Sequence, residues 1–269
     1  MSDNKAFEEK WASARGGAGK AEEKTIFVPK GTRPKTQRQF NLFHYFEFIA
    51  GRIEGKNYRT ALEVGCGRGT IGLYLNRYLG MEVTLLDSSK DAVELAQWNF
   101  AHWGGKGVFR VEDARVLSFP ESSFDVIATI GLLEHLEDYR PVLREMYRAL
   151  KPGGVLFSVN IPKKKSIQVL NNIFRSFLRF GKRELHKDYY RNTDTPDNFK
   201  HHAEEVGFED VKVFYVNPFP LFTPVPVWAE RILVKFYRGV YVMRGIVMSY
   251  PFRGSRMFSQ AHFLSAKKK

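Results

Sequence analysis

The sequence predicts an α/β fold built around a parallel sheet. From residue 60 to residue 159, short apolar stretches that fit buried strands alternate with segments whose apolar residues recur at helical spacing. A glycine-rich turn follows the first of these strands, and two later strands end in an acidic residue. Because the ligands of such sheets lie at the carboxyl ends of the strands, we expect the functional site at that edge.

The first strand and the turn after it lie between Thr60 and Leu75. Three glycines, spaced G-x-G-x-G, let the backbone approach a ligand at the N-terminus of the next helix. A dinucleotide fingerprint requires a third glycine at position 70, where this chain has Thr70. Glu63, two residues before the first glycine, would repel a pyrophosphate but would tolerate a cationic amine. The turn therefore favours S-adenosylmethionine over NAD.

The second predicted strand, 82–87, ends in Asp87, which lies 18 residues after Gly69. At that spacing α/β nucleotide folds place a carboxylate that accepts hydrogen bonds from ribose hydroxyls. An alternative is that Asp87 only caps the helix that begins near Asp91. We predict the ribose role for Asp87, with Ser88 beside it.

The remaining elements continue the alternation of strands and helices. An amphipathic helix over 37–53 precedes the first strand and is predicted to cover one face of the sheet. Lys151-Pro-Gly-Gly154 is a strong stop signal for a helix. We expect further strands at 107–113, 122–129 and 154–159, and further helices at 91–103, 142–150 and 195–206.

Five landmarks together resemble a known family. They are Glu63-x-Gly-x-Gly-x-Gly69, Asp87, Asp113-Ala114, Phe124-Asp125-Val126 with Leu133-Glu-His-Leu136, and Leu150-Lys-Pro-Gly-Gly154. In this order the chain resembles the class I S-adenosylmethionine-dependent methyltransferases of the type 11 group. The resemblance implies a Rossmann-like, seven-stranded, mostly parallel sheet with helices on both faces. It also implies an antiparallel C-terminal hairpin, for which 208–215 and 260–265 are the expected strands.

The resemblance further implies S-adenosylmethionine as the cofactor and a set of residues that hold it. Glu63 would orient the methionine end through its amine, and the carbonyl region of Ile130 would bind the same amino group. Asp113 and Ala114 would hold adenine through a carboxylate and a backbone N–H. The predicted cofactor-binding residues are Glu63, Gly65, Cys66, Gly67, Gly69, Asp87, Ser88, Asp113, Ala114 and Ile130.

Methyl transfer from a sulfonium depends mainly on alignment, but a hydroxyl acceptor also needs a base. His135 is the predicted base, and the alternative is that it only caps or packs its loop. Some quinone-biosynthesis O-methyltransferases of this family carry E-x-x-E-H here, which can hold a divalent cation. Gly131 replaces the first acid, so we predict no metal. Cys66 has no activating base in the nearby sequence and is predicted to form a wall of the cofactor pocket.

The chain is predicted to form one domain, 37–269, preceded by a largely flexible arm at 1–36 that orders, if at all, near the active site. Insertions at 163–194 and 217–257 would cover the substrate. A single cysteine and the lack of an apolar N-terminal segment predict a cytoplasmic location. The longest uncharged run, 213–229, contains four prolines, so we expect no membrane-spanning helix.

The net charge of +13 is distributed unevenly. Residues 37–162 hold 14 basic and 15 acidic side chains, whereas residues 163–269 hold 20 and 9. The basic, apolar segments 163–183 and 227–244 have three interpretations: they dock on an anionic membrane surface, bind RNA, or form an ordinary helical cap. Their excess of Phe, Val, Ile and Met favours lipid over RNA.

The resulting hypothesis is S-adenosylmethionine-dependent methyl transfer to a small-molecule acceptor that is hydrophobic or lipid-like. One alternative is a non-catalytic module that binds the cofactor or a lipid, and another is an RNA methyltransferase. The lack of an Asn/Asp-Pro-Pro-Tyr motif after the fourth strand disfavours the amino groups of nucleic acids as acceptors. The oligomeric state is left open by the sequence.

Overall fold

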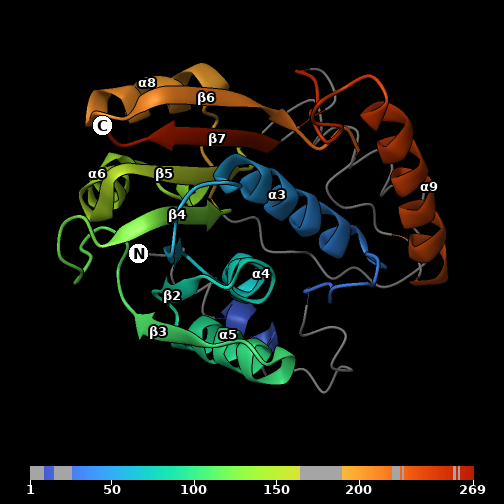
Figure 1. The fold of residues 1–269 in the computed structure, drawn as a ribbon, viewed down its shortest axis with the longest axis horizontal. Helices are drawn as coiled ribbons and strands as arrows, with labels where there is room; N and C mark the ends of the chain where they lie inside the picture. Colours follow the sequence, from blue (N-terminus) through green and yellow to red (C-terminus); the bar gives the residue numbers. More distant parts are fainter. Residues whose placement is uncertain are drawn as a thin grey trace.

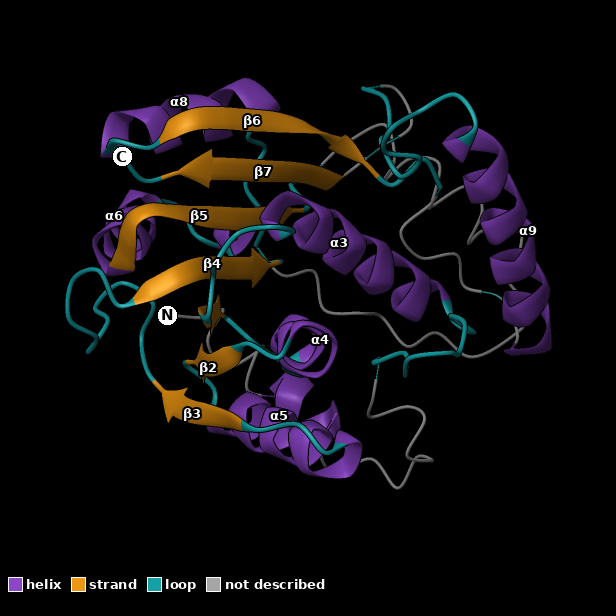
Figure 2. Cartoon of the chain, in the orientation of Figure 1, coloured by secondary structure: helices purple, strands orange, loops and turns teal. Residues whose placement is uncertain are grey.

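A seven-stranded sheet runs through the centre of the molecule, in the strand order β3-β2-β1-β4-β5-β7-β6 (Figures 1 and 2). The computed structural model describes residues 9–14, 26–163, 190–219, 225, 227–256, 259 and 261–269 of the 269-residue chain. The strands are β1 (Thr60–Val64), β2 (Glu82–Asp87), β3 (Gly107–Val111), β4 (Phe124–Ile130), β5 (Leu150–Asn160), β6 (Glu209–Val216) and β7 (Ala261–Lys267). The helices are α3 (Gln37–Ile53), α4 (Thr70–Leu79), α5 (Lys90–Trp103), η1 (Leu133–His135), α6 (Arg140–Ala149), α8 (Pro196–Val206) and α9 (Val227–Gly245).

The pairing of the strands confirms the predicted fold class. Strands β1 to β5 pair in parallel, and β7 lies between β5 and β6, antiparallel to both. The chain runs outward from β1 through β2 to β3 and then returns to β4 on the other side of β1. The carboxyl ends of β1 and β4 therefore flank the switch point at which α/β sheets bind their ligands.

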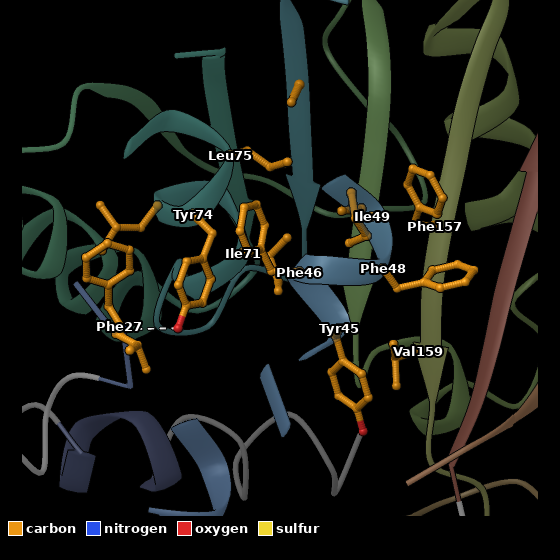
Figure 3. Close-up of a cluster of buried hydrophobic side chains, with 14 of the residues drawn as sticks. Phe27, Tyr45, Phe46, Phe48, Ile49, Ile71, Tyr74, Leu75, Phe157 and Val159 are labelled. Atoms are coloured by element: carbon orange, nitrogen blue, oxygen red, sulfur yellow. Dashed lines mark hydrogen bonds between the residues drawn. The ribbon is translucent and has the colours of Figure 1, made fainter. Parts of the chain in front are cut away.

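Helices cover both faces of the sheet. On one face α3, α4 and α5 contribute to a single apolar cluster, and on the other α6 and α8 contribute to a second one. Figure 3 shows part of the first cluster, in which Phe46 of α3 stacks on Tyr74 of α4 with ring centroids 4.8 Å apart. Ile49 of α3 is fully buried in the same cluster. The predicted role of the 37–53 helix as a cover of the sheet is confirmed.

The packed core begins before the predicted domain boundary at residue 37. Phe27 and Val28 are 4% and 1% exposed and belong to the core cluster beside α4. The backbone N–H of Val28 donates to the Tyr74 hydroxyl at 3.0 Å, and the Tyr78 hydroxyl donates to the Val28 carbonyl at 2.8 Å. These contacts fix residues 26–28 on the domain, so the predicted arm is too long at its C-terminal end.

Strand β5 also begins earlier than predicted. Helix α6 ends at Ala149, as the stop signal indicates, but the next strand begins at once because Leu150 pairs with Phe124 of β4. The Lys151 ammonium then donates to Asp125 at 3.0 Å. The stretch that ends the helix is therefore already part of the sheet.

The two predicted insertions are described to different extents. Of the first, 163–194, only 163 and 190–194 belong to the described residues, and the basic segment 164–183 lies outside them. In the second, α9 runs from Val227 to Gly245 and lies beside one end of α3 on the side toward which β4 points (Figure 1). None of the helices in the described part of the chain is long and apolar enough to cross a membrane.

Candidate cofactor site

The turn between β1 and α4 has a backbone that favours glycine. Gly65, Gly67 and Gly69 have φ angles of 65°, 51° and 66°, all in the left-handed region. A Cβ atom added at Gly69 would stand 2.8 Å from the Leu85 side chain, and one at Gly67 would stand 2.7 Å from the ring of Trp11. The turn is therefore restricted both by its dihedral angles and by what packs against it.

Glu63 lies at the carboxyl end of β1 and is 4% exposed. Its Oε2 accepts the N–H of Gly72 at 2.8 Å, and its Oε1 accepts that of Ile71 at 3.4 Å, so the carboxyl group faces the first turn of α4. Burial raises the pKa of Glu63 to about 8, although these hydrogen bonds oppose the rise. The predicted contact with the methionine amine stays a prediction, and a cation there would favour the ionised form.

Asp87, the last residue of β2, joins the glycine turn to the next helix. Its Oδ2 accepts the N–H of Gly67 at 2.9 Å, and its Oδ1 accepts the N–H of Ser89 at 3.0 Å. The N-cap of α5 is Ser89, whose hydroxyl accepts the N–H of Ala92. An ionised carboxylate offers about four acceptor sites, and ribose hydroxyls are donors of the kind that it binds. Ser88 is exposed beside it.

Cys66 is part of the core rather than a reactive group. Its side chain is buried in the cluster beneath the turn, and its N–H donates to the Leu86 carbonyl at 2.9 Å. Burial raises the pKa of the thiol well above its usual value, so almost no thiolate forms at neutral pH. A role as a wall of the cofactor pocket agrees with this position.

Asp113 and Ala114 follow β3 at the edge of the sheet. The Asp113 side chain is 49% exposed and pairs with the guanidinium of Arg115, whose terminal nitrogen lies 2.6 Å from Oδ2. Hydrogen bonding to Arg115 lowers the pKa of Asp113. Ala114 is half-buried against the second apolar cluster. The predicted adenine contact stays a prediction, because a ligand would have to share this carboxylate with Arg115.

The loop after β4 brings a buried acid, Glu134, to the same edge of the sheet. Ile130 is half-buried at the end of β4, and the next residue, Gly131, donates its N–H to the Val159 carbonyl at 2.8 Å. Leu132 follows, and a Cβ atom at Gly65 would stand 3.2 Å from its side chain. The loop therefore packs directly on the glycine turn, and η1 comes immediately after it.

Glu134, in η1, is a candidate site residue that the sequence-based predictions did not select. It is 1% exposed, and its Oε2 has no hydrogen-bond partner among the described residues. Burial raises its pKa to about 7, and the nearby charges of Arg191 and Lys10 oppose the rise. A buried carboxyl with a pKa near neutrality suits proton transfer. Its sequence signals were its place in Leu133-Glu-His-Leu136 and its match to the second acid of E-x-x-E-H.

His135, the predicted base, is oriented by the loop that follows residue 189. Its Nδ1 lies 2.7 Å from the Tyr190 carbonyl, which can only accept, so Nδ1 carries the proton and Nε2 of the neutral ring is the acceptor. Nε2 lies 4.0 Å from Oε1 of Glu134. Asn192 holds the loop in place by donating its N–H to the Glu134 carbonyl at 2.7 Å. Glu134 and the acceptor nitrogen of His135 thus lie side by side.

Residues 9–14 form a helix that lies over the glycine turn. Besides the contact of Trp11 with Gly67, the Arg68 guanidinium lies 6.0 Å from the Trp11 ring centroid. Burial, with the nearby charges of Arg38 and Arg68, lowers the pKa of Lys10 to about 8. Within the described residues, no three His, Cys, Asp or Glu side chains are placed to share a metal ion.

Residues 61–154 match the model of a family described as a methyltransferase domain. The chain is also similar to the demethylmenaquinone methyltransferase of Listeria monocytogenes serotype 4a. The two are 34% identical over 171 residues, which is 57% of this chain and 71% of that protein. The chain belongs to the class I S-adenosylmethionine-dependent methyltransferases. This confirms the family resemblance found in the sequence.

Two further comparisons place this class I methyltransferase among its relatives. It is 33% identical over 112 residues to the ubiquinone biosynthesis O-methyltransferase of Xanthomonas axonopodis, which is 41% of this chain and 46% of that protein. The matched part therefore spans less than half of that relative. A phosphoethanolamine N-methyltransferase of Haemonchus contortus in complex with S-adenosylmethionine shares the fold, with a TM-score of 0.54, 18% identity, and coverage of 90% of this chain and 61% of that one.

S-adenosylmethionine is the cofactor of this family, and the residues at the carboxyl edge of the sheet fit it. Left-handed φ angles keep the turn free of side chains of its own, and the ring of Trp11 lies against Gly67, so a ligand at this backbone would be covered by the helix of residues 9–14. The carboxylate of Asp87 supplies acceptors of the kind that ribose hydroxyls need, and the buried acid Glu63 suits a cationic amine better than a phosphate.

Proposed function

We propose that this protein transfers the methyl group of S-adenosylmethionine to a hydrophobic small-molecule acceptor, and that a quinol-type ring is the first class to test. The observation that carries the proposal is the buried carboxyl of Glu134, with one oxygen free of hydrogen bonds to described residues, in the loop that packs on the glycine turn through Leu132. The names of two relatives support the acceptor class, since they refer to ubiquinone biosynthesis and to demethylmenaquinone.

In this proposal the cofactor lies along the carboxyl ends of β1, β2 and β4. Glu63 and the carbonyl of Ile130 orient the methionine amine, and Asp87 with Ser88 binds the ribose. Asp113 and Ala114 bind adenine after Arg115 shares or releases the carboxylate. Gly65, Gly67 and Gly69 supply close backbone approach, and Cys66 closes the pocket wall.

When bound, S-adenosylmethionine would supply a methyl group on a sulfonium, and the sulfur would keep the electron pair of the sulfur–carbon bond as the acceptor gained its bond to that carbon. The protein's part is alignment and proton removal. For a hydroxyl acceptor, Nε2 of His135 takes the proton while Nδ1–H stays bonded to the Tyr190 carbonyl. Glu134, 4.0 Å away, stabilises the imidazolium when it is ionised.

The proposal includes a cytoplasmic protein that attaches peripherally to an anionic membrane through the predicted segments 163–183 and 227–244. A water-insoluble acceptor would be reached at such a surface. The first segment lies almost entirely outside the described residues, and the second contains α9, whose surface is developed below.

The test is a transfer assay with S-adenosylmethionine labelled in its methyl group, a lipid extract containing reduced quinones, and total RNA in a parallel reaction. We expect label in the organic phase and its loss in Asp87→Asn. The matched control is Asp210→Asn, because Asp210 is exposed on β6 and pairs only with Lys212 among the ion pairs of the described residues. Cofactor binding without transfer to any fraction would instead indicate a non-catalytic module, and label in RNA would indicate an RNA methyltransferase.

A further inference from the structure

Helix α9 and the turn after it expose an unusual amount of apolar surface. Of the thirteen large apolar side chains that are exposed in the described part of the chain, seven lie within the 20 residues 228–247, each at least 60% exposed. They are Trp228, Ile232, Phe236, Val242, Met243, Ile246 and Val247. Scattered single exposures are ordinary on protein surfaces, whereas a contiguous group marks an interaction site.

These side chains form a stripe, because residues four apart share a helix face. Trp228, Ile232 and Phe236 follow one another at that spacing. The opposite side of α9 holds the helix on the protein: Tyr237 is 4% exposed and stacks on Phe219 with centroids 4.2 Å apart, and Tyr241 stacks on His44 at 3.9 Å. Packing of the domain therefore accounts for the inner face of α9 and leaves the outer stripe unexplained.

Basic side chains flank the stripe along one side. Arg231, Lys235 and Arg238 lie at i, i+4 and i+7, next to the apolar stripe on the helix surface. None of the three forms an ion pair with another described residue. An apolar stripe beside cations is the pattern of a helix that lies in the plane of a membrane interface, where anionic headgroups attract the charges.

The position of α9 links this surface to the cofactor site. The Gln37 N–H at the start of α3 donates to Glu230 of α9 at 2.9 Å. The next residue, Arg38, is close enough to Arg68 of the glycine turn to contribute to lowering its pKa. Helix α9 therefore lies on the side of the molecule toward which β4 points, where the carboxyl edge of the sheet is found (Figure 1).

We propose that α9 docks on an anionic lipid bilayer, with Trp228, Ile232 and Phe236 in the acyl boundary and Arg231, Lys235 and Arg238 against the headgroups. The docking goes beyond methyl transfer, because it requires neither cofactor nor acceptor. Lipid fits better than RNA because the stripe combines aliphatic and aromatic side chains, whereas single strands need stacked aromatic platforms. The docked protein would open its acceptor site toward the membrane.

The test is flotation of the full chain with two kinds of vesicle. One is phosphatidylcholine alone, and the other also contains roughly 30 mol% phosphatidylglycerol, which gives it the surface charge of a strongly anionic leaflet. We expect recovery with the anionic vesicles. Each cation near such a surface contributes about fivefold to the partition coefficient, so the triple variant Arg231→Gln, Lys235→Gln, Arg238→Gln should lose about a hundredfold. The triple variant Trp228→Ser, Ile232→Ser, Phe236→Ser should also lose recovery with the anionic vesicles, although it keeps all three cations.

The matched control removes the same net charge elsewhere, through Arg140→Gln, Lys200→Gln and Lys212→Gln, and should change the partition coefficient less than twofold. Thermal unfolding of every variant checks that the fold is kept. Equal recovery of wild type and both α9 variants would overturn the proposal. A dimer that dissociates in the apolar variant would also overturn the proposal, because the face would then bind a second copy of the chain. Displacement of the protein from vesicles by RNA would overturn it as well. Transfer to a short-chain, water-soluble quinol, measured on the same samples, reports separately on the proposed function.

Discussion

The glycine turn and helix α9 lie toward the same edge of the sheet, but they are built in opposite ways. At the turn, Glu63 and Asp87 are buried, and each carboxylate oxygen accepts a backbone N–H. On α9, apolar side chains such as Trp228 point outward, and the basic residues remain at the surface. The turn is thus organised around one small cationic ligand, whereas the helix presents an extended apolar and basic surface.

The distribution of charge agrees with this contrast. Residues 37–162, which contain the turn, carry one more acidic than basic side chain, whereas residues 163–269 carry 11 more basic ones. Changes at the turn should therefore alter cofactor binding or chemistry and leave vesicle binding intact, and changes on α9 should do the reverse. The predictions below use this separation.

The largest effect is expected from Glu134→Gln. We predict that kcat falls about a hundredfold while the Kd for S-adenosylmethionine stays within twofold, because the buried carboxyl assists proton removal and holds no part of the cofactor. Initial rates and calorimetry give the two quantities. The control is Glu137→Gln, an exposed acid in the same loop. A variant with the wild-type rate would remove Glu134 from the chemistry.

Asp125→Asn should lower stability rather than alter either binding surface. Although burial opposes it, the N–H groups of Thr60 and Arg59 and the ammonium of Lys151 hold the pKa of Asp125 at about 2. Because the pKa in the folded state lies below the unfolded value, this contribution is present above pH 4 or so and is lost as the pH falls toward 2. We expect a loss of about 2 kcal/mol in the free energy of unfolding at pH 7.

Denaturant titrations of the wild type and Asp125→Asn at pH 7 and pH 3 test this sign. The difference between the two proteins should shrink at the lower pH, while Asp210→Asn should match the wild type at both. A difference that grows on acidification would contradict the assignment of the stabilising contacts to Asp125.

Binding of S-adenosylmethionine should release a proton from Glu63. With a pKa of about 8, the free carboxyl is mostly protonated at pH 7, and a cationic amine beside it favours the ionised form. Calorimetry at pH 7 in buffers of different ionisation enthalpy should show release of about 0.9 proton per cofactor, which corresponds to roughly 1.4 kcal/mol of linkage. Glu63→Gln should abolish the release. Proton uptake, or none, in the wild type would mean that the amine lies elsewhere.

The smallest effect is expected from Trp11→Ala. Loss of the indole that lies against Gly67 should raise the Kd for the cofactor about fivefold, or about 1 kcal/mol, and leave vesicle partitioning unchanged. The matched substitution on the other surface is Trp228→Ala, because the indole of Trp228 is exposed on α9. It should weaken vesicle binding and leave the Kd unchanged. If both substitutions changed both quantities, the two regions would not be independent.

The sequence allowed the sheet and the cofactor turn to be predicted because both depend on local patterns. Apolar periodicity indicates the strands, and the spacing from Gly69 to Asp87 brings that carboxylate to the N–H of Gly67. The predicted hairpin of β6 and β7 is also confirmed.

Features that depend on distant segments could not be predicted. The raised pKa of Glu134 comes from its burial, which no local pattern predicts, and the opposing charges of Arg191 and Lys10 come from distant segments. The packing of Phe27 beneath α4 could not be predicted from the sequence either. The basic and apolar composition of α9 was visible in the sequence. The side of α9 that packs on the domain was not visible, because the inner face combines Tyr237 with Val234 while equally apolar residues such as Ile232 face outward.

The most direct measurement of the proposed cofactor site is calorimetric titration of S-adenosylmethionine into the wild type, Asp87→Asn and Asp210→Asn. We predict one binding site per chain in the wild type and an unchanged Kd in Asp210→Asn. In Asp87→Asn the Kd should rise about a hundredfold, because hydrogen bonds to a charged group contribute about 1.5–3 kcal/mol. Absence of binding to the wild type, or an unchanged Kd in Asp87→Asn, would contradict the assignment of this edge of the sheet as the cofactor site.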